Sequence, residues 1–209
     1  KFSHPDPTVN RQSGFLSPNL INSSTHGLAL SLPYYLVISE NKDFTFTPRL
    51  YGDGQNVIQN EYRQVNKSSS HIVDLGVNNS KLLFFGSQTK SHFFSNSTFD
   101  LGLDYFSSSN FELNLEKTTN DTYLKTYKIE SPLIDNNSLL NSYLRFNAEN
   151  DSLSLNASME VYDDLSQGSS DKYEYVYPNY EVSKRIDLSD TSLSFSSYGF
   201  QKKYETNKY

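Results

Sequence analysis

The stretch LSLNASMEV (Leu153–Val161) alternates apolar residues with polar or small ones throughout. Successive side chains of a β-strand point to opposite faces, so strict alternation predicts a strand with one apolar and one polar face. The same period of two recurs along most of the chain. It is found in the runs Leu28–Tyr35, Phe44–Thr47, Phe99–Tyr105, Phe111–Glu116 and Tyr173–Tyr177.

Turn-forming residues separate these runs, for example at Glu40–Asp43, Gly52–Gly54 and Ser107–Asn110. Asn, Asp and Gly tolerate the backbone conformations that hairpin turns require. We therefore predict an all-β antiparallel meander of about ten strands, each roughly 7 to 11 residues long. Between Leu193 and Phe200 the apolar phase slips at Ser196–Ser197, which predicts a β-bulge. No stretch predicts a helix of more than one or two turns.

The composition of the 209-residue chain excludes several classes of protein. It contains no cysteine, which excludes a disulfide scaffold, a thiolate metal site and a cysteine nucleophile. The formal net charge of −6 argues against a nucleic-acid partner. The longest apolar runs, Tyr34–Ile38 and Leu82–Phe85, are far shorter than the roughly 20 residues of a transmembrane helix. With no initiator Met and no secretory signal, we expect a processed protein or an excised fragment.

Two architectures fit the alternation equally well. In a soluble β-sandwich the apolar faces pack on each other, whereas in an outer-membrane barrel the apolar face meets lipid and the polar face lines a lumen. The predicted strands exceed the sandwich mode of about 5 to 6 residues. One face is polar over its whole length, and tyrosines gather near strand ends, as interfacial girdles require. These features favour part of an outer-membrane barrel.

The residues offer no constellation for catalysis or metal binding. The four histidines, at positions 4, 26, 71 and 92, lack the spacing of a metal-ligand set. No nucleophile elbow and no glycine-rich phosphate loop occurs. Carboxylates such as Asp163–Asp164, or Glu112 with Glu116, are expected to be solvated turn or lumen residues. We predict no enzyme, no catalytic residue, no metal and no cofactor.

Two prolines lie inside predicted strands, Pro33 in the run Leu28–Tyr35 and Pro48 in the run Phe44–Tyr51. Proline cannot donate a ladder hydrogen bond and belongs on an edge strand or at a bulge. Either both prolines mark strand ends, or two successive strands are weakened in their pairing.

The segment HPDPTVNRQSGFLSP (His4–Pro18) resembles a junction sequence of the LPS-assembly outer-membrane protein family LptD. Shorter blocks resemble the same family in the same order, so the resemblance covers nearly the whole chain. They are Leu32–Tyr35, Asp43–Arg49, Asn60–Arg63, Asp121–Leu124 and Tyr177–Tyr180. The junction residues that match the family are His4, Pro5, Asp6, Pro7, Arg11, Ser13, Gly14 and Phe15.

The resemblance implies a domain organisation and a location. In that family a periplasmic jellyroll precedes the junction and a very large antiparallel barrel follows it. Residues 1–27 would be the junction leading into the first strand, and residues 28–209 the N-terminal portion of the barrel in a Gram-negative outer membrane. The sequence departs from the family in lacking the jellyroll, the later strands and the cysteines of some members.

The resemblance also implies a function: insertion of lipopolysaccharide into the outer leaflet through a lateral gate near the first strands. Pro33 and Pro48 would weaken that gate, and Arg11, Arg49 and Arg63 would meet phosphates in the lumen or form ion pairs there. The implied partners are lipopolysaccharide, membrane lipid, an LptE-like plug lipoprotein and, through the missing jellyroll, a periplasmic LPS-bridge protein. A general outer-membrane pore or adhesin barrel and a soluble β-sandwich that binds glycans stay open as alternatives.

Overall fold

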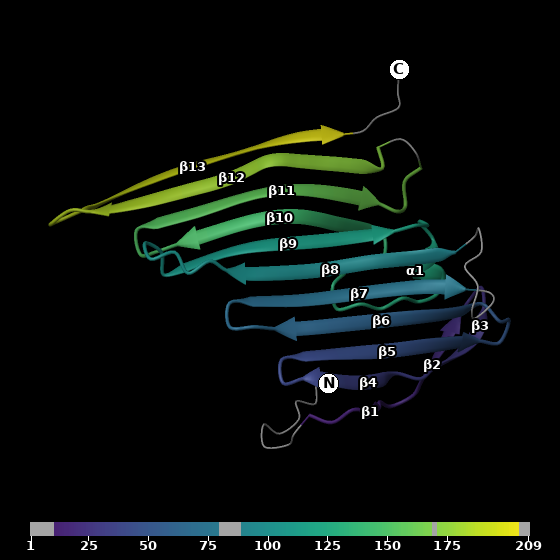
Figure 1. Cartoon of the computed structure of the whole chain (residues 1–209). Helices are drawn as coiled ribbons and strands as arrows, with labels where there is room; N and C mark the ends of the chain where they lie inside the picture. The colour runs from purple at the N-terminus through teal and green to yellow at the C-terminus, as the bar shows by residue number, and fades with distance from the viewer. Residues whose placement is uncertain (1–10, 80–88, 169–170, 205–209) are drawn as a thin grey trace.

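The computed structural model describes residues 11–79, 89–168 and 171–204. These residues form thirteen strands of one sheet and a single-turn helix, α1 (Tyr123–Thr126) (Figure 1). The strands are β1 (Gly14–Phe15), β2 (Asn19–Ser23), β3 (Gly27–Ser31), β4 (Tyr34–Ser39), β5 (Lys42–Tyr51), β6 (Asn56–Val65), β7 (Ser69–Asn79), β8 (Lys90–Asp100), β9 (Ser108–Thr118), β10 (Leu139–Glu149), β11 (Leu153–Asp164), β12 (Tyr173–Asp187) and β13 (Ser192–Tyr204).

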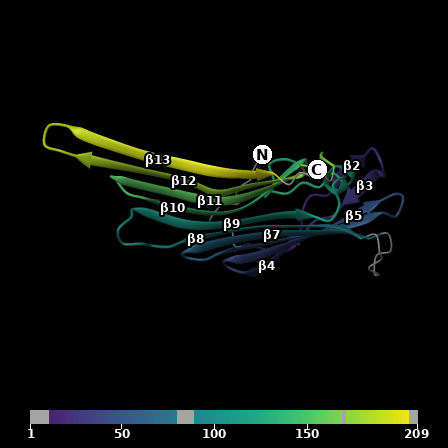
Figure 2. The same ribbon diagram turned by 90° about the horizontal axis from the view of Figure 1, so that it is seen from above.

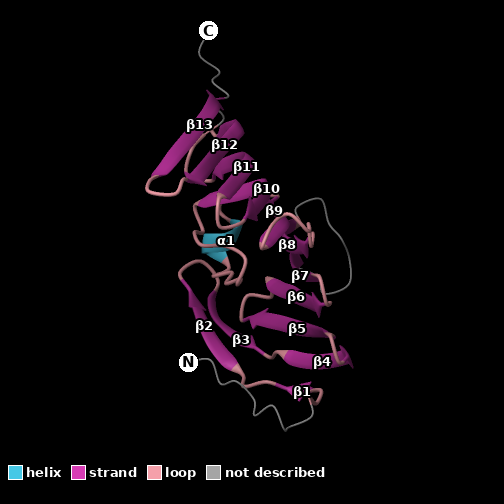
Figure 3. Cartoon of the chain, turned by 90° about the vertical axis from the view of Figure 1, so that its left-hand side faces the viewer, coloured by secondary structure: helices cyan, strands magenta, loops and turns pink. Residues whose placement is uncertain are grey.

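The sheet is an antiparallel meander, in which each strand from β4 to β13 pairs with its neighbours in sequence. At its first edge β1 pairs with β4, while β2 and β3 form a hairpin whose second strand pairs with the end of β5. Figure 2 shows the sheet as a single layer, and Figure 3 shows α1, β2 and β3 on its concave side. The predicted all-β meander is confirmed. Among the described residues no second sheet packs against it, so the arrangement is consistent with a portion of a β-barrel.

The alternation of the sequence separates two faces of this sheet. The face opposite α1 carries large apolar side chains that are between 38 % and 57 % exposed, with nothing packed over them among the described residues. They are Phe46, Leu75, Phe93, Leu115, Leu144 and Met159. The concave face carries the polar partners of the alternation, such as Asp43, Asp74 and Glu160.

Among the described residues, the compact apolar core lies at one end of the concave face, beneath the connection between β9 and β10 (residues 119–138). Tyr123, Leu124, Tyr127 and Ile129 are at most 2 % exposed and pack against strand ends, including Val57 and Phe94. Burial of one such side chain contributes roughly 1.5 to 3 kcal/mol. This connection therefore folds back onto the sheet instead of extending into solvent.

Local hydrogen bonds explain why α1 is so short. The Asn120 side chain accepts hydrogen bonds from the backbone N–H and the hydroxyl of Thr122, at 3.1 and 2.8 Å, and turns the chain into the helix. Lys128 adopts a φ of 50°, a left-handed conformation that ends it. In the part of the chain that the structure describes, no helix has the length and apolar character needed to cross a membrane.

The strand boundaries correct three expectations. The described residues hold thirteen strands rather than about ten. Leu32–Pro33 divides one predicted strand into β3 and β4, and β1 and β2 form within the segment that was expected to be a junction. The predicted run Phe99–Tyr105 pairs only as far as Asp100. Gly102 has a φ of 55° there, and the chain turns back to β9. Strand lengths range from 2 to 15 residues, wider than the predicted range.

The predicted bulge at Ser196–Ser197 is wrong in its position. These residues pair regularly with Ser183 and Val182. The irregularity lies in the partner strand, between Val176 and Asn179, where Pro178 has no N–H for the ladder. The apolar phase slips in β13 because this edge strand exposes large side chains on both of its faces.

Candidate functional site

The concave face presents a transverse band of polar side chains. Directly opposed residues on neighbouring strands lie on the same face. One such row runs from β5 to β11 through Asp43, Arg63, Ile72, Asn96, Asn114, Tyr143 and Glu160. With Ile72 as its one apolar member, this row lines the concavity with donors and acceptors suited to a hydrated polar solute.

Arg11 and Arg63 converge on one buried carboxylate in this band. The Nε atom of Arg63 lies 2.8 Å from Asp43 Oδ1, and a guanidinium nitrogen of Arg11 contacts the other oxygen. Arg11 also donates to the Tyr35 hydroxyl at 2.6 Å. The Asp43 side chain is 5 % exposed, whereas the two arginine side chains are 40 % and 43 % exposed. Both guanidinium groups therefore keep faces toward the concavity, with Glu61 3.4 Å from Arg63 as a further counter-charge.

Arg49 is placed differently from the other two predicted arginines. It is 6 % exposed, and its guanidinium donates to the carbonyl of Lys128 and the side chain of Gln59, both at 2.8 Å. Burying a charged group costs less when protein acceptors replace water, as they do here for both terminal nitrogens of Arg49, whereas its Nε has no partner. Here Arg49 fastens the connection 119–138 to the sheet and presents no open surface to a phosphate.

The Arg49 contacts continue into a buried polar chain. Gln59 Nε2 donates to Asp74 Oδ2 at 2.7 Å, and Asp74 Oδ1 lies 3.2 Å from His92 Nε2. The Asp74 and His92 side chains are fully buried, and the His92 ring stacks on Phe94 with centroids 4.5 Å apart. This chain of groups fixes the end of the sheet beneath α1 and lacks the solvent access of a catalytic site.

Prolines form a row across the first strands. Leu16 donates its N–H to the carbonyl of Pro33 at 2.9 Å, and Leu32 donates to Pro48 at 3.1 Å. In an antiparallel ladder such a pair normally exchanges two hydrogen bonds, but proline has no N–H to return. Each of these two contacts is therefore one-sided.

Pro18 extends this row, since it lies between β1 and β2 at the level where Pro33 separates β3 from β4. The alternation of the sequence did not predict this position for Pro18. The signal was the regular spacing of Pro18, Pro33 and Pro48, fifteen residues apart. Ser31 pairs with Arg49 and Tyr34 pairs with Phe46, so β3 and β4 keep one common register across the interruption.

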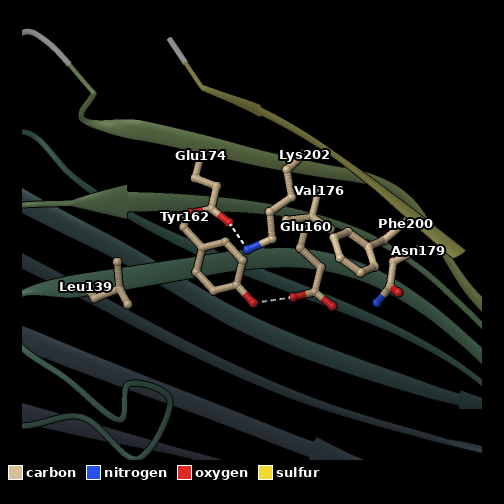
Figure 4. Close-up of a pocket in the computed structure, with 8 residues that line it drawn as sticks. All are labelled: Leu139, Glu160, Tyr162, Glu174, Val176, Asn179, Phe200 and Lys202. Atoms are coloured by element: carbon tan, nitrogen blue, oxygen red, sulfur yellow. Dashed lines mark hydrogen bonds and ion pairs between the residues drawn. The ribbon is translucent and has the colours of Figure 1, made fainter. Parts of the chain in front are cut away.

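An open pocket of about 490 Å³ lies on the concave side of the last strands (Figure 4). Tyr162 donates to Glu160 Oε2 at 2.5 Å, and Lys202 pairs with Glu174 at 2.6 Å across its floor. Phe200 projects from β13 at its rim. The pocket joins polar groups to an aromatic ring and carries no nucleophile activated by a base.

The structure covers part of the predicted junction motif. His4, Pro5, Asp6 and Pro7 lie outside the described residues. Ser13 accepts a hydrogen bond from the Val37 N–H at 2.9 Å, Gly14 and Phe15 form β1, and the Phe15 ring packs edge-on against Tyr34. The motif therefore begins the sheet at its first edge. Among residues 11–79, 89–168 and 171–204, no group of three or more His, Asp or Glu residues is arranged to hold a metal ion.

These features define a class: a single antiparallel sheet, consistent with part of a barrel, with a polar concave face, an apolar outer face and a proline-interrupted first edge. No protein-family model matches the chain. It is 42 % identical over 59 residues to the LPS-assembly protein LptD of Nitrosococcus oceani, a stretch that covers 28 % of this chain and 8 % of that protein.

Two further relatives carry the same name. The LptD of Cupriavidus pinatubonensis is 34 % identical over 122 residues, which cover 58 % of this chain and 14 % of that protein. The LptD of Pseudomonas aeruginosa is 37 % identical over 71 residues, covering 34 % and 8 %. The matched stretches thus span 8 % to 14 % of these three relatives, and they support a relationship to LptD proteins.

Proposed function

We propose that this chain is the start of the barrel wall of an LptD-type translocon, which inserts lipopolysaccharide into the outer leaflet of a Gram-negative outer membrane. The observation that carries the proposal is the row Pro18–Pro33–Pro48 at the first edge of the sheet. The partial similarity to LPS-assembly proteins supports the same assignment. The protein acts as a transporter without covalent chemistry.

The proline row supports a lateral gate on energetic grounds. A backbone hydrogen bond contributes about 0.5 to 1.5 kcal/mol net in water, and an unmet group costs more where no water replaces the partner. Two one-sided contacts and a first strand of only two paired residues make this edge the weakest part of the described sheet. A seam here opens at lower cost than one between β6 and β7, which pair over ten residues.

The two faces suit an amphipathic substrate. The exposed apolar face contacts acyl chains, and the polar concave band takes the hydrated saccharide. In this proposal Arg11 and Arg63 bind substrate phosphates, which is supported by the partial exposure of their side chains. Arg49 instead has a structural role, because it joins the connection 119–138 to the sheet.

The barrel portion, in this proposal, begins at Gly14, because β1 and β2 already pair with the sheet. A boundary after residue 27 would divide the hairpin of β2 and β3. A plug lipoprotein on the concave side and a periplasmic LPS-bridge protein complete the proposed assembly.

The gate is tested by restoring the missing donors. Pro33→Ala with Pro48→Ala, made in the full-length protein, supplies N–H groups opposite Leu16 and Leu32. We expect a severalfold loss of newly exported lipopolysaccharide at the cell surface, measured by surface labelling. The matched control is Pro178→Ala, at an exposed position in β12, far from the first edge of the sheet. Unchanged surface lipopolysaccharide with normal levels of folded double variant would reject the gate.

A further inference from the structure

The first hairpin is attached to the sheet by few ladder contacts. Strand β3 pairs with β5 through only three residues, Ala29, Leu30 and Ser31. Within the proline row, Pro33 separates β3 from β4 and Pro18 separates β2 from β1. The hairpin is therefore hinged at the proline row, and other contacts must hold it against the concave face, where Figure 3 shows it.

The connection 119–138 holds the tip of this hairpin through contacts of Ser23 and His26, which we call the catch. The last carbonyls of a helix have no intrahelical partner. Here the hydroxyl of Ser23, on the hairpin, donates to the Thr126 carbonyl at 2.6 Å. The next two carbonyls are taken by the end of β5, through the Tyr51 hydroxyl on Tyr127 and the Arg49 guanidinium on Lys128, both at 2.8 Å. One turn of helix thus joins the hairpin to the strand beside it.

Ring stacking and an ion pair close the same contact. The His26 ring, in the hairpin turn, stacks on Tyr127 with centroids 4.8 Å apart and planes 10° from parallel. His26 Nδ1 lies 2.6 Å from Asp53 Oδ2 in the turn between β5 and β6. Beneath them Ala29 and Ile21 pack on the α1 core. The contact is specific, since it uses both the tip and the inner face of the hairpin.

We propose that residues 119–138 are a latch on the first hairpin, and that the strands at the proline row separate only when His26 and Ser23 leave Tyr127 and Thr126. The hinge, the short β3–β5 ladder and the catch at the tip together make a flap that is held against the concave face at its tip. The connection between β9 and β10 would thereby control the opening of an edge four strands away. The role of the latch in export rests on the function proposed above, whereas its physical behaviour does not.

The latch itself is tested by hydrogen exchange on the full-length protein in detergent micelles. Ser23→Ala with His26→Ala removes the catch. We expect amide exchange in β3 and in α1 to rise at least tenfold, with β10 and β11 unchanged. The matched control is Ser69→Ala with His71→Ala, which makes the same two substitutions at a Ser–His pair on β7, away from the latch. Equal protection of β3 in the variant and the unsubstituted protein would overturn the latch.

A locked variant tests the coupling to export. The chain has no cysteine of its own. Ser23→Cys with Thr126→Cys places two thiols on the residues that meet at the catch, and mass spectrometry scores whether a reducible crosslink forms between them. We expect lipopolysaccharide export to fall severalfold when the pair is oxidised and to recover on reduction. Equal export in both states contradicts the coupling. Depletion of the unsubstituted protein is run in parallel: if surface lipopolysaccharide persists, the proposed function fails, while the exchange result still decides the latch.

Discussion

The end of the sheet beneath α1 and the last two strands, β12 and β13, arise from the same alternating pattern but differ in burial. At the first, Val57, Phe94 and Leu124 are completely buried. At the second, Phe195 and Phe200 are each 62 % exposed, one on either face of β13. Alternation therefore sets which face a side chain occupies. Whether that face is covered depends on a segment distant in sequence.

The comparison also separates two uses of polar groups. Beneath α1, Arg49, Asp74 and His92 are buried and engaged with one another through Gln59 and with backbone carbonyls. On the last strands, Lys202 and Glu174 pair in the open pocket of Figure 4, where solvent reaches them. The first set stabilises one packed arrangement, and the second remains available to a solute.

The largest expected effect is on the α1 core. Leu124→Ala removes a completely buried side chain and should lower the free energy of unfolding by about 2 to 5 kcal/mol. Leu193→Ala, at a 60 % exposed position on β13, should change it by less than about 0.5 kcal/mol. Urea unfolding in micelles, followed by circular dichroism, measures both. Equal losses would mean that β13 is as well covered as the α1 end.

Two glycines give the next largest contrast. A Cβ at Gly76 would lie 2.2 Å from His92 Cε1, in the packed core, so Gly76→Ala should cost about 1 to 3 kcal/mol of stability. A Cβ at Gly199 would meet the ring of Tyr180 at 2.9 Å. That ring is 40 % exposed and free to shift, so Gly199→Ala should be nearly neutral. The same unfolding measurement checks the pair, and a costly Gly199→Ala would show that the last strands are rigid.

The smallest effect is expected from pH. Burial alone would raise the pKa of Asp53, but hydrogen bonds from His26 and the Gln55 N–H outweigh it and lower the pKa below its ordinary 3.8. A carboxyl with a lowered folded-state pKa stabilises above its unfolded value and loses that contribution as pH falls through the folded value. Protection of the first hairpin should therefore weaken only below about pH 4.

Asp53→Asn is the control for this pH effect, because it removes the titrating group. The difference between the two proteins should not exceed about 1 kcal/mol, since the Asp53 side chain is 41 % exposed. It is measured as the shift in unfolding temperature between pH 6 and pH 2.5. If Asp53→Asn shows the same shift in unfolding temperature as the unsubstituted protein, the His26–Asp53 contact does not contribute to the latch.

Much of the fold followed from local pattern. The periods of two and the Asn, Asp and Gly clusters predicted the meander, the absence of long helices and a polar face opposite an apolar one. Pro33 and Pro48 were selected because proline lacks a ladder donor, and the structure places both at one-sided contacts. The predicted strand ends were wrong where a single glycine turns the chain, as at Gly102. The His4–Pro7 part of the junction motif lies outside the described residues.

The sequence by itself determined the strands and their two faces, because a period of two depends only on backbone geometry. Only the tertiary structure decided which polar residues are buried. Arg11, Arg49 and Arg63 look equivalent in sequence, yet Arg49 alone is covered, because residues 119–138 fold back over it. The folding of residues 119–138 onto the sheet also brings Thr126 into contact with Ser23, 103 positions away in the sequence. Contacts of this kind depend on which strand ends meet in space, and side-chain alternation carries no information about that.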